Sequence, residues 1–387
     1  MPTTESRTKL LPVPMLDLGR EFAAIRGPVM AAMEAVCAGQ RFILGPEVER
    51  FEQAAAAFCG VAHAVGCASG TDAIWLAMAA LGIGPGDAVV TTPFSFFATV
   101  SSILRAGATP LLADIDEHTF NLSPEAVATV LQGQRVAAIL PVHLYGQCAD
   151  MSAFGALAQT HHAKVIEDAA QAFGATWNGV RAGALGDAAA FSFYPTKNLS
   201  AFGDAGMVTT SDAALAEHMR MLRAHGMRKR YYHDEVGWNS RLDTLQAAVL
   251  EVKLTRVEAG NVRRREIAAS YDRRLRAAGL VGATTEEGIV LPSTDPRAGH
   301  VFHQYVIRAP RRDELRAFLS ANGIGSEVYY PLPLHQQPSL LSLGYKAGDF
   351  PVAERAAAEV LALPMFPELH EDEIESVVEG VRQFYRG

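Results

Sequence analysis

Cysteine is scarce and scattered in this chain of 387 residues. The four cysteines, Cys37, Cys59, Cys67 and Cys148, form no C-x-x-C pair, so the sequence predicts neither a zinc site nor a disulfide framework. No H-x-x-x-H motif or cluster of carboxylates predicts another metal site. Because free thiols persist in a reducing compartment, we expect the protein to be cytoplasmic.

Positive charge and long apolar runs are also lacking. The chain carries 34 Lys and Arg against 42 Asp and Glu, a formal charge of -8. A nucleic-acid binder needs a basic face for phosphates, so we expect no nucleic acid as partner. No uninterrupted apolar run has the length of a membrane span, and residues 1–9 precede none, so we expect no span, signal peptide or transit peptide.

Short apolar strands alternate with helices along most of the chain, and this order predicts an α/β fold with a mostly parallel mixed sheet flanked by helices. At 387 residues two lobes are expected. We predict a large domain over residues 15–255 and a smaller C-terminal α/β domain over residues 256–387. In such sheets ligands bind beyond the carboxyl ends of the strands. The predicted strands of the large domain are 62–67, 88–92, 110–113, 136–142, 165–167, 188–193 and 207–210, and its first helices are 22–37, 46–58, 73–81, 98–106 and 151–160.

The most informative segment runs from residue 165 to residue 197. A short apolar run ends at Asp168, and a second apolar segment carries Lys197, where an unpaired ammonium group is costly. Pyridoxal phosphate needs such a pair: a carboxylate to keep its ring nitrogen protonated and an amine to form a Schiff base. Burial would lower the pKa of Lys197 and favour the nucleophilic amine. On these two residues alone, a strand acid and a loop lysine with no shared role fit equally well.

Small polar residues supply candidates for a phosphate site. Gly70 and Thr71 stand between a predicted strand and a predicted helix, where free backbone N–H groups bind anions. An ordinary helix cap explains the same residues. Ser192, five residues before the lysine, offers a second hydroxyl, or is a strand serine bonded to backbone. Phe96 could stack on a pyridine ring, although two of the three phenylalanines in residues 94–97 are expected in the core. Gln171 could donate a hydrogen bond to the ring oxygen.

Two histidines are expected at the cleft. His143 lies in P-V-H-L-Y-G and His335 lies in Y-Y-P-L-P-L-H, each at a predicted strand or loop end. The charged run R-R-R-E at residues 263–266 is typical of a solvated helix face.

Taken in order, these segments resemble the DegT/DnrJ/EryC1/StrS family of pyridoxal-phosphate sugar aminotransferases, which have the fold type I architecture. The resemblance covers nearly the whole chain. One departure is Gly203-Asp204-Ala205-Gly206, where members often carry G-E-G-G, and it puts the sugar position in doubt. The matching segments are residues 14–20, 68–73, 91–99, 141–146, 166–175, 191–199 and 237–248.

The resemblance implies a role for each candidate residue. Lys197 would form the aldimine and carry the proton, Asp168 would hold the ring nitrogen, Gln171 would bind the ring oxygen, and Phe96 would stack on the ring. The phosphate would be bound by Gly70, Thr71, Ser192 and Asn239, the last reaching over from a neighbouring subunit of a homodimer. Substrate contacts are assigned to His143, Arg241, Tyr330 and His335.

The implied activity is a transamination with pyridoxal and pyridoxamine phosphate intermediates. An amino donor, usually L-glutamate in this family, would give its amino group to a nucleotide-linked keto sugar. A keto-cyclitol of the scyllo-inosose type is an alternative acceptor. A sugar dehydratase is disfavoured, because that branch usually has histidine in place of Lys197. A regulator that binds pyridoxal phosphate without catalysis is a third alternative, which the retained lysine and aspartate disfavour.

Overall fold

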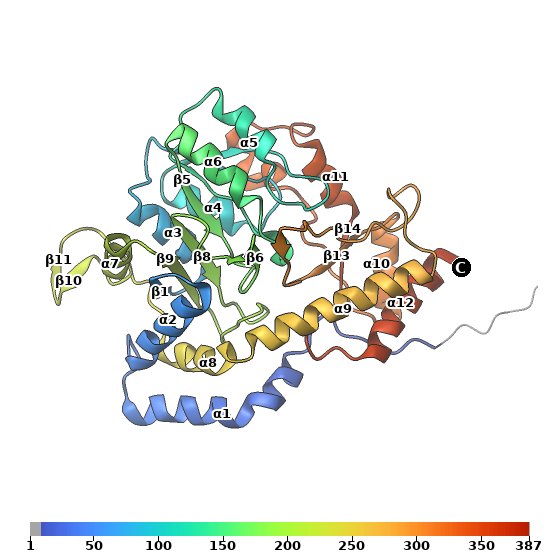
Figure 1. Ribbon diagram of the computed structural model, residues 1–387, viewed down its shortest axis with the longest axis horizontal. Coiled ribbons are helices and arrows are strands. Elements are labelled where there is room, and N and C mark those ends of the chain that lie inside the picture. Colours follow the sequence, from blue (N-terminus) through green and yellow to red (C-terminus); the bar gives the residue numbers. More distant parts are fainter. Residues whose placement is uncertain (1–8, 387) are drawn as a thin grey trace, which may run out of the picture.

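A seven-stranded sheet forms the centre of the computed structural model, which describes residues 9–386 (Figure 1). The strand order is β1-β9-β8-β5-β4-β2-β3. Neighbours are parallel from β8 to β3, whereas β9 is antiparallel to both of its neighbours. The predicted α/β class and mostly parallel sheet are therefore confirmed. The strands are β1 (His63–Cys67), β2 (Ala88–Thr91), β3 (Thr109–Leu112), β4 (Ala138–Ile139), β5 (Lys164–Asp168), β8 (Ala188–Ser192) and β9 (Gly206–Thr210).

Both faces of this sheet are buried, because successive side chains of each strand point to opposite faces. On β5, Val165 packs into the cluster on one face and Ile166 into the cluster on the other. The first face is covered by α2 (Pro46–Cys59), α5 (Pro124–Leu131), α6 (Met151–His161) and α8 (Thr244–Leu254), and the second by α3 (Gly70–Ala80), α4 (Ala98–Arg105) and α7 (Ala213–Leu222). The sheet is thus the middle of three layers.

A smaller lobe follows the long helix α9 (Val257–Ala277), which runs away from the sheet in Figure 1. Its antiparallel strands β13 (Tyr305–Arg308) and β14 (Val360–Leu363) are surrounded by α10 (Arg312–Ala321), α11 (Pro351–Glu359) and α12 (Glu371–Arg386). The domain boundary at residue 255 stays a prediction, and it coincides with the break between α8 and α9.

Short strands join distant parts of the chain. β12 (Ala298–Gly299) pairs with β6 (Thr176–Trp177), which also pairs with β7 (Val180–Arg181). A separate hairpin of β10 (Met227–Lys229) and β11 (Tyr232–His233) projects from the body on the side away from the C-terminus (Figure 1). These pairs were not predicted, because two- and three-residue strands carry almost no periodicity.

Helix α1 (Leu18–Gly39) bears on the expectation that the chain has no membrane span. By length and composition alone it is apolar enough to cross a membrane, although charged residues interrupt its apolar ones. Ile25 and Val29 of α1 pack against Val249 of α8, whereas Leu18 and Met30 are 43% and 50% exposed. One face of α1 is therefore covered by the large domain and another carries exposed apolar side chains. Residues 1–8, on which the expectation of no targeting segment partly rests, lie outside the described residues.

Candidate active site

The predicted site residues meet at one edge of the central sheet. Asp168 ends β5 and Ser192 ends the parallel strand β8, with Asp168 opposite Ala190 in the register. The loop after β8 carries Lys197, and α3 starts directly after β1. Because the carboxyl ends of parallel strands share one edge, residues far apart in the sequence converge there.

Asp168 is a buried acid whose carboxylate accepts two hydrogen bonds. Its side chain is 4% exposed. Thr99 Oγ1 donates to Asp168 Oδ2 at 2.8 Å, and the Ala170 backbone N–H donates to Oδ1 at 3.3 Å. Burial raises the pKa of Asp168, while these hydrogen bonds and the charge of Lys197 act in the opposite direction. Sequence reasoning missed Thr99, although it belongs to the recognised segment at residues 91–99.

Lys197 presents a free amine beside this acid. No hydrogen bond or ion pair joins its Nζ to any residue in the range 9–386 that the structure describes. Burial lowers the pKa of Lys197 to about 8, with the charge of Asp168 opposing the shift. A lysine of lowered pKa without a partner is chemically available as a nucleophile and proton carrier.

The start of α3 and the end of β8 form a cradle for an anion. Ser69 caps the helix by accepting from the Asp72 N–H at 3.1 Å, which leaves the N–H groups of Gly70 and Thr71 without partners among residues 9–386. A Cβ atom added to Gly70 would lie 2.6 Å from Ser192 Cβ, so only glycine lets the serine hydroxyl stand beside the helix terminus. The three predicted phosphate residues of this subunit are thus together.

The departure at residues 203–206 lies behind the same turn. A Cβ atom on Gly206 would lie 2.2 Å from the Ser69 carbonyl oxygen, and Ala205 is 1% exposed. The departure therefore lies next to the anion cradle.

Gln171, three residues after Asp168, contacts Tyr145 and Tyr330. The Gln171 Oε1 atom accepts from the Tyr145 N–H at 2.6 Å, and its Nε2 donates to the Tyr330 hydroxyl at 3.2 Å. Tyr330 stands 6.2 Å, between ring centroids, from Phe96, which is 60% exposed. The expectation of two core phenylalanines in this loop is wrong: Phe94 is 1% exposed, but Phe97 is 37% exposed.

The two histidines predicted at the cleft are buried inside the protein. His143 has no exposed side-chain surface; its Nε2 lies 3.0 Å from Glu167 Oε2, and its Nδ1 accepts from the Ala149 N–H at 3.2 Å. His335 is 1% exposed, and its Nε2 lies 3.0 Å from Glu354 Oε1. The structure contradicts both as substrate contacts, since neither side chain reaches the cleft surface. His143 does follow a bridge between Val142 and Asp168, but His335 lies in the short 3-10 helix Leu334–Gln336, and for neither residue did the motif indicate the direction of the side chain.

Asn239 and Arg241 lie farther along the chain, beside the start of α8. Asn239 is exposed and pairs with Ala224 through a backbone bridge, while Ser240 donates to Asp72 Oδ2 at 2.7 Å. Arg241 is half-buried and makes no ion pair with any residue of the described range. Both side chains are therefore available for an outside partner.

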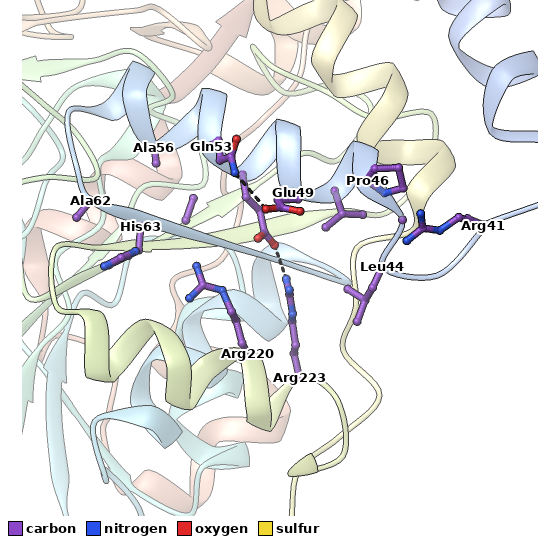
Figure 2. A pocket seen from close by; sticks show the side chains of 14 residues that line it. Arg41, Leu44, Pro46, Glu49, Gln53, Ala56, Ala62, His63, Arg220 and Arg223 are labelled. Atoms are coloured by element: carbon purple, nitrogen blue, oxygen red, sulfur yellow. Dashed lines mark hydrogen bonds and ion pairs between the residues drawn. The ribbon is translucent and has the colours of Figure 1, made fainter. Parts of the chain in front are cut away.

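A separate pocket lies along the free edge of β1, between α2 and α7 (Figure 2). It measures about 610 Å³ and is lined by residues that include Arg41, His63 and Arg220. Arg223 and Glu52 form an ion pair there, Glu52 accepts from the Gly66 N–H at 2.8 Å, and Arg223 donates to the Gly66 carbonyl at 2.6 Å. This pair satisfies the edge strand much as another strand would.

Comparisons with known proteins agree with this arrangement. A profile of the DegT/DnrJ/EryC1/StrS aminotransferase family matches residues 24–382, and the chain belongs to that family. It is 51% identical to a pleiotropic regulatory protein of Geobacillus stearothermophilus over 374 residues, 97% of this chain and 99% of the relative. It is 43% identical to a UDP-N-acetyl-3-dehydro-alpha-D-glucosamine 3-aminotransferase of Acidithiobacillus ferrooxidans over 375 residues, 97% and 98% of the two chains.

A solved structure carries the same fold. The crystal structure of Streptomyces venezuelae DesV in complex with a ketimine intermediate matches with a TM-score of 0.92 and 43% identity, over 98% of this chain and all of that one. The predicted family, fold class and enzyme class, an aminotransferase, are confirmed, and pyridoxal phosphate as cofactor agrees with them.

Proposed function

We propose that this protein is a pyridoxal-phosphate aminotransferase that moves an amino group from an amino acid to the 3-keto group of a nucleotide-linked sugar. One observation carries the proposal: Lys197 has a free amine of lowered pKa, about 8, next to the buried Asp168 and close to an open helix terminus. The name of the Acidithiobacillus relative supports carbon 3 as the position aminated.

The residues present fit the cofactor. Gly70, Thr71 and Ser192 would hold its phosphate, Asp168 would keep the proton on its ring nitrogen, and the Gln171 amide would donate to its ring oxygen. When bound, pyridoxal phosphate supplies the carbonyl that takes up the amino group and a protonated ring that withdraws electrons.

Lys197 has two tasks in this scheme. Its neutral amine would bind the cofactor. When an amino substrate takes its place, the free amine would carry the proton that the substrate carbon loses or gains. Desolvation supports both tasks, because it favours the neutral amine near physiological pH. Thr99 and Ala170 donate to the carboxylate of Asp168, and these hydrogen bonds favour its charged form against the effect of burial.

A homodimer with shared active sites belongs to the proposal. Exposed apolar residues of this chain support it, because monomeric proteins rarely leave large apolar patches uncovered. They lie on α1, in the loop before α2, and around the β10–β11 hairpin. Asn239, also exposed, would then reach the phosphate of the partner subunit. The cytoplasmic location stays a prediction. The apolar side chains are Leu18, Met30, Phe42, Ile43, Leu44, Tyr231, Tyr232 and Val236.

The substrate side is assigned to two residues. Tyr330 contacts both Gln171 and Phe96, and we assign it to the sugar of the substrate. Arg241 has no anionic partner among residues 9–386, and we assign it to the diphosphate of the nucleotide. L-Glutamate is the proposed amino donor.

The test is a pair of half-reactions followed by absorbance and mass spectrometry. With pyridoxal phosphate bound, L-glutamate should shift the absorbance band and release 2-oxoglutarate. The amino form should then aminate UDP- or dTDP-linked 3-keto sugars faster than 4-keto isomers. Preference for a 4-keto sugar or for scyllo-inosose would replace the proposed acceptor. Failure to bind the cofactor at all would overturn the proposed enzyme, whereas cofactor binding without release of 2-oxoglutarate would favour a regulator.

A further inference from the structure

The side chains of Asn261, Asn198 and His303 form a hydrogen-bonded chain that includes the residue after Lys197. The direction of each hydrogen bond in this chain is fixed. The Phe173 carbonyl accepts from Asn261 Nδ2 at 3.1 Å, so Asn261 Oδ1 must face Asn198. Asn198 Nδ2 donates to that oxygen at 2.8 Å and to the Val301 carbonyl at 3.3 Å. Asn198 Oδ1 is then left as the acceptor for His303 Nδ1, 3.1 Å away.

This direction determines the tautomer of His303. A carbonyl oxygen only accepts hydrogen bonds, so both amides are oriented by the backbone and His303 must carry its proton on Nδ1. The lone pair therefore lies on Nε2. Burial lowers the pKa of His303 well below its ordinary value, and the nearby positive charges of Lys197 and Arg264 act in the same direction.

The backbone around His303 is anchored as well. Arg264 of α9, 5% exposed, donates from Nη1 to the carbonyls of Phe302, His303 and Met365 at 3.3, 3.4 and 3.0 Å. The His303 side chain is 7% exposed. Its Nε2 atom has no hydrogen-bond partner among residues 9–386, and it is not one of the fully buried atoms that lack a partner. The Nε2 atom of His303 is therefore a hydrogen-bond acceptor to which no described residue donates.

We propose that His303 is a positioning residue of the aminotransferase site: its Nδ1–H, fixed by the relay through Asn198 and Asn261, holds the loop that carries Lys197. Asn198 directly follows Lys197 in the chain, so the relay fixes the loop that carries the lysine. It also joins this loop to the carbonyl after β5 and to the smaller lobe. The proposal rests on the proposed function for the use of Lys197 as the reactive amine.

Two matched substitutions test the relay. His303→Asn places an amide N–H near the position of Nδ1, whereas His303→Gln places it near Nε2 and cannot reach Asn198 in the same way. We expect His303→Asn to keep kcat within about threefold, and His303→Gln and His303→Ala to lose about tenfold or more, with KM changed less. Equal losses in all three variants would mean that only ring volume matters and would overturn the relay.

A second readout does not need the cofactor. Acetic anhydride labelling of the cofactor-free protein between pH 6 and 10, with mass spectrometry of the Lys197 peptide, gives the pKa of that amine. We expect a midpoint near 8 in the parent protein, as its lowered pKa implies, and an upward shift of about half a unit or more in His303→Ala, because water enters. Lys164, 53% exposed, is the internal control.

The two proposals can fail separately. An unchanged Lys197 midpoint in His303→Ala overturns the role of His303, whatever the activity. A parent protein that labels as expected but releases no 2-oxoglutarate from L-glutamate overturns the proposed function and leaves the relay in place.

Discussion

Glu52 and Asp168 are both buried acids with a cation nearby, but only Glu52 binds its cation directly. At the free edge of β1, Glu52 binds Arg223 directly, and both also bond to the backbone of Gly66. At the carboxyl end of β5, Asp168 is bonded to Thr99, and Lys197 has no partner within the described chain. We call Glu52 and Arg223 the closed pair, because they bind each other, and Asp168 and Lys197 the open pair, because they do not.

The difference separates structure from chemistry. The closed pair neutralises its own charges and bonds to the backbone of an edge strand, although Arg223 Nε is buried without a hydrogen-bond partner among residues 9–386. The open pair leaves the Lys197 amine without a partner beside a carboxylate, which costs stability and creates reactivity. A pocket of about 610 Å³ lies at the closed pair, whereas the candidate active site lies at the open one.

Removing the open cation should have the largest effect. We expect Lys197→Ala to lower turnover by about 10⁴-fold or more, since both cofactor binding and proton transfer lose their amine. The variant should still bind pyridoxamine phosphate, because the phosphate cradle and Asp168 are intact. Stopped assays of 2-oxoglutarate release and a fluorescence titration with pyridoxamine phosphate measure the two quantities. Activity like that of the parent protein would refute the assignment of Lys197.

Removing the open acid should come next. Asp168→Asn should lower kcat by about 10²- to 10⁴-fold, because an amide does not hold the ring nitrogen protonated. The affinity for the cofactor should change much less. Thr99→Val, which removes only the donor to Asp168, serves as the graded control, and we expect a smaller loss of about tenfold. Steady-state kinetics with saturating cofactor gives both values, and an equal loss in the two variants would contradict this order.

Breaking the closed pair should affect stability instead of activity. Glu52→Gln leaves Arg223 buried with a neutral partner, and we expect a loss of about 2–3 kcal/mol in the free energy of unfolding. The kcat of the folded enzyme should stay within about twofold. Glu49→Gln on the exposed side of the same helix is the matched control and should cost less than about 0.5 kcal/mol. Urea unfolding compares the three proteins, and equal stability of both variants would mean that the pair is dispensable.

The smallest effect tests the cost of keeping the lysine open. The folded-state pKa of Lys197, about 8, lies below its ordinary value of 10.5, so the unfolded chain binds the proton more tightly. The penalty is complete below pH 8 and disappears as the pH rises from 8 to 10.5. Lys197→Met in the cofactor-free protein should therefore gain roughly 1–2 kcal/mol at pH 7, with allowance for the partial exposure of the lysine.

Thermal unfolding of the parent protein and of Lys197→Met at pH 7 and pH 10 measures this gain. A constant difference at both values would assign it to packing of the methionine and not to the charge.

Much of this protein was predictable from sequence patterns. The alternation of apolar strands and helices predicted the three layers, because period-2 and period-3.6 patterns depend only on local geometry. The convergence of Asp168, Ser192 and Lys197 was predictable too, since each stands at or just after the end of a parallel strand. Thr99 and the relay through Asn198 were not, because their partners lie 63 or more residues away along the chain.

Glu167 and Asp168 show where the sequence stops. They are neighbours on β5, yet Glu167 is turned to the inner side, where His143 and the N–H groups of Gly183, Leu185 and Gly186 surround it. The sequence alone determined the strand, its end, and therefore the presence of an acid at the site. Only the tertiary structure decided which acid faces the cleft, and with it the burial of His143, because the direction of a side chain depends on the register and packing of the whole sheet.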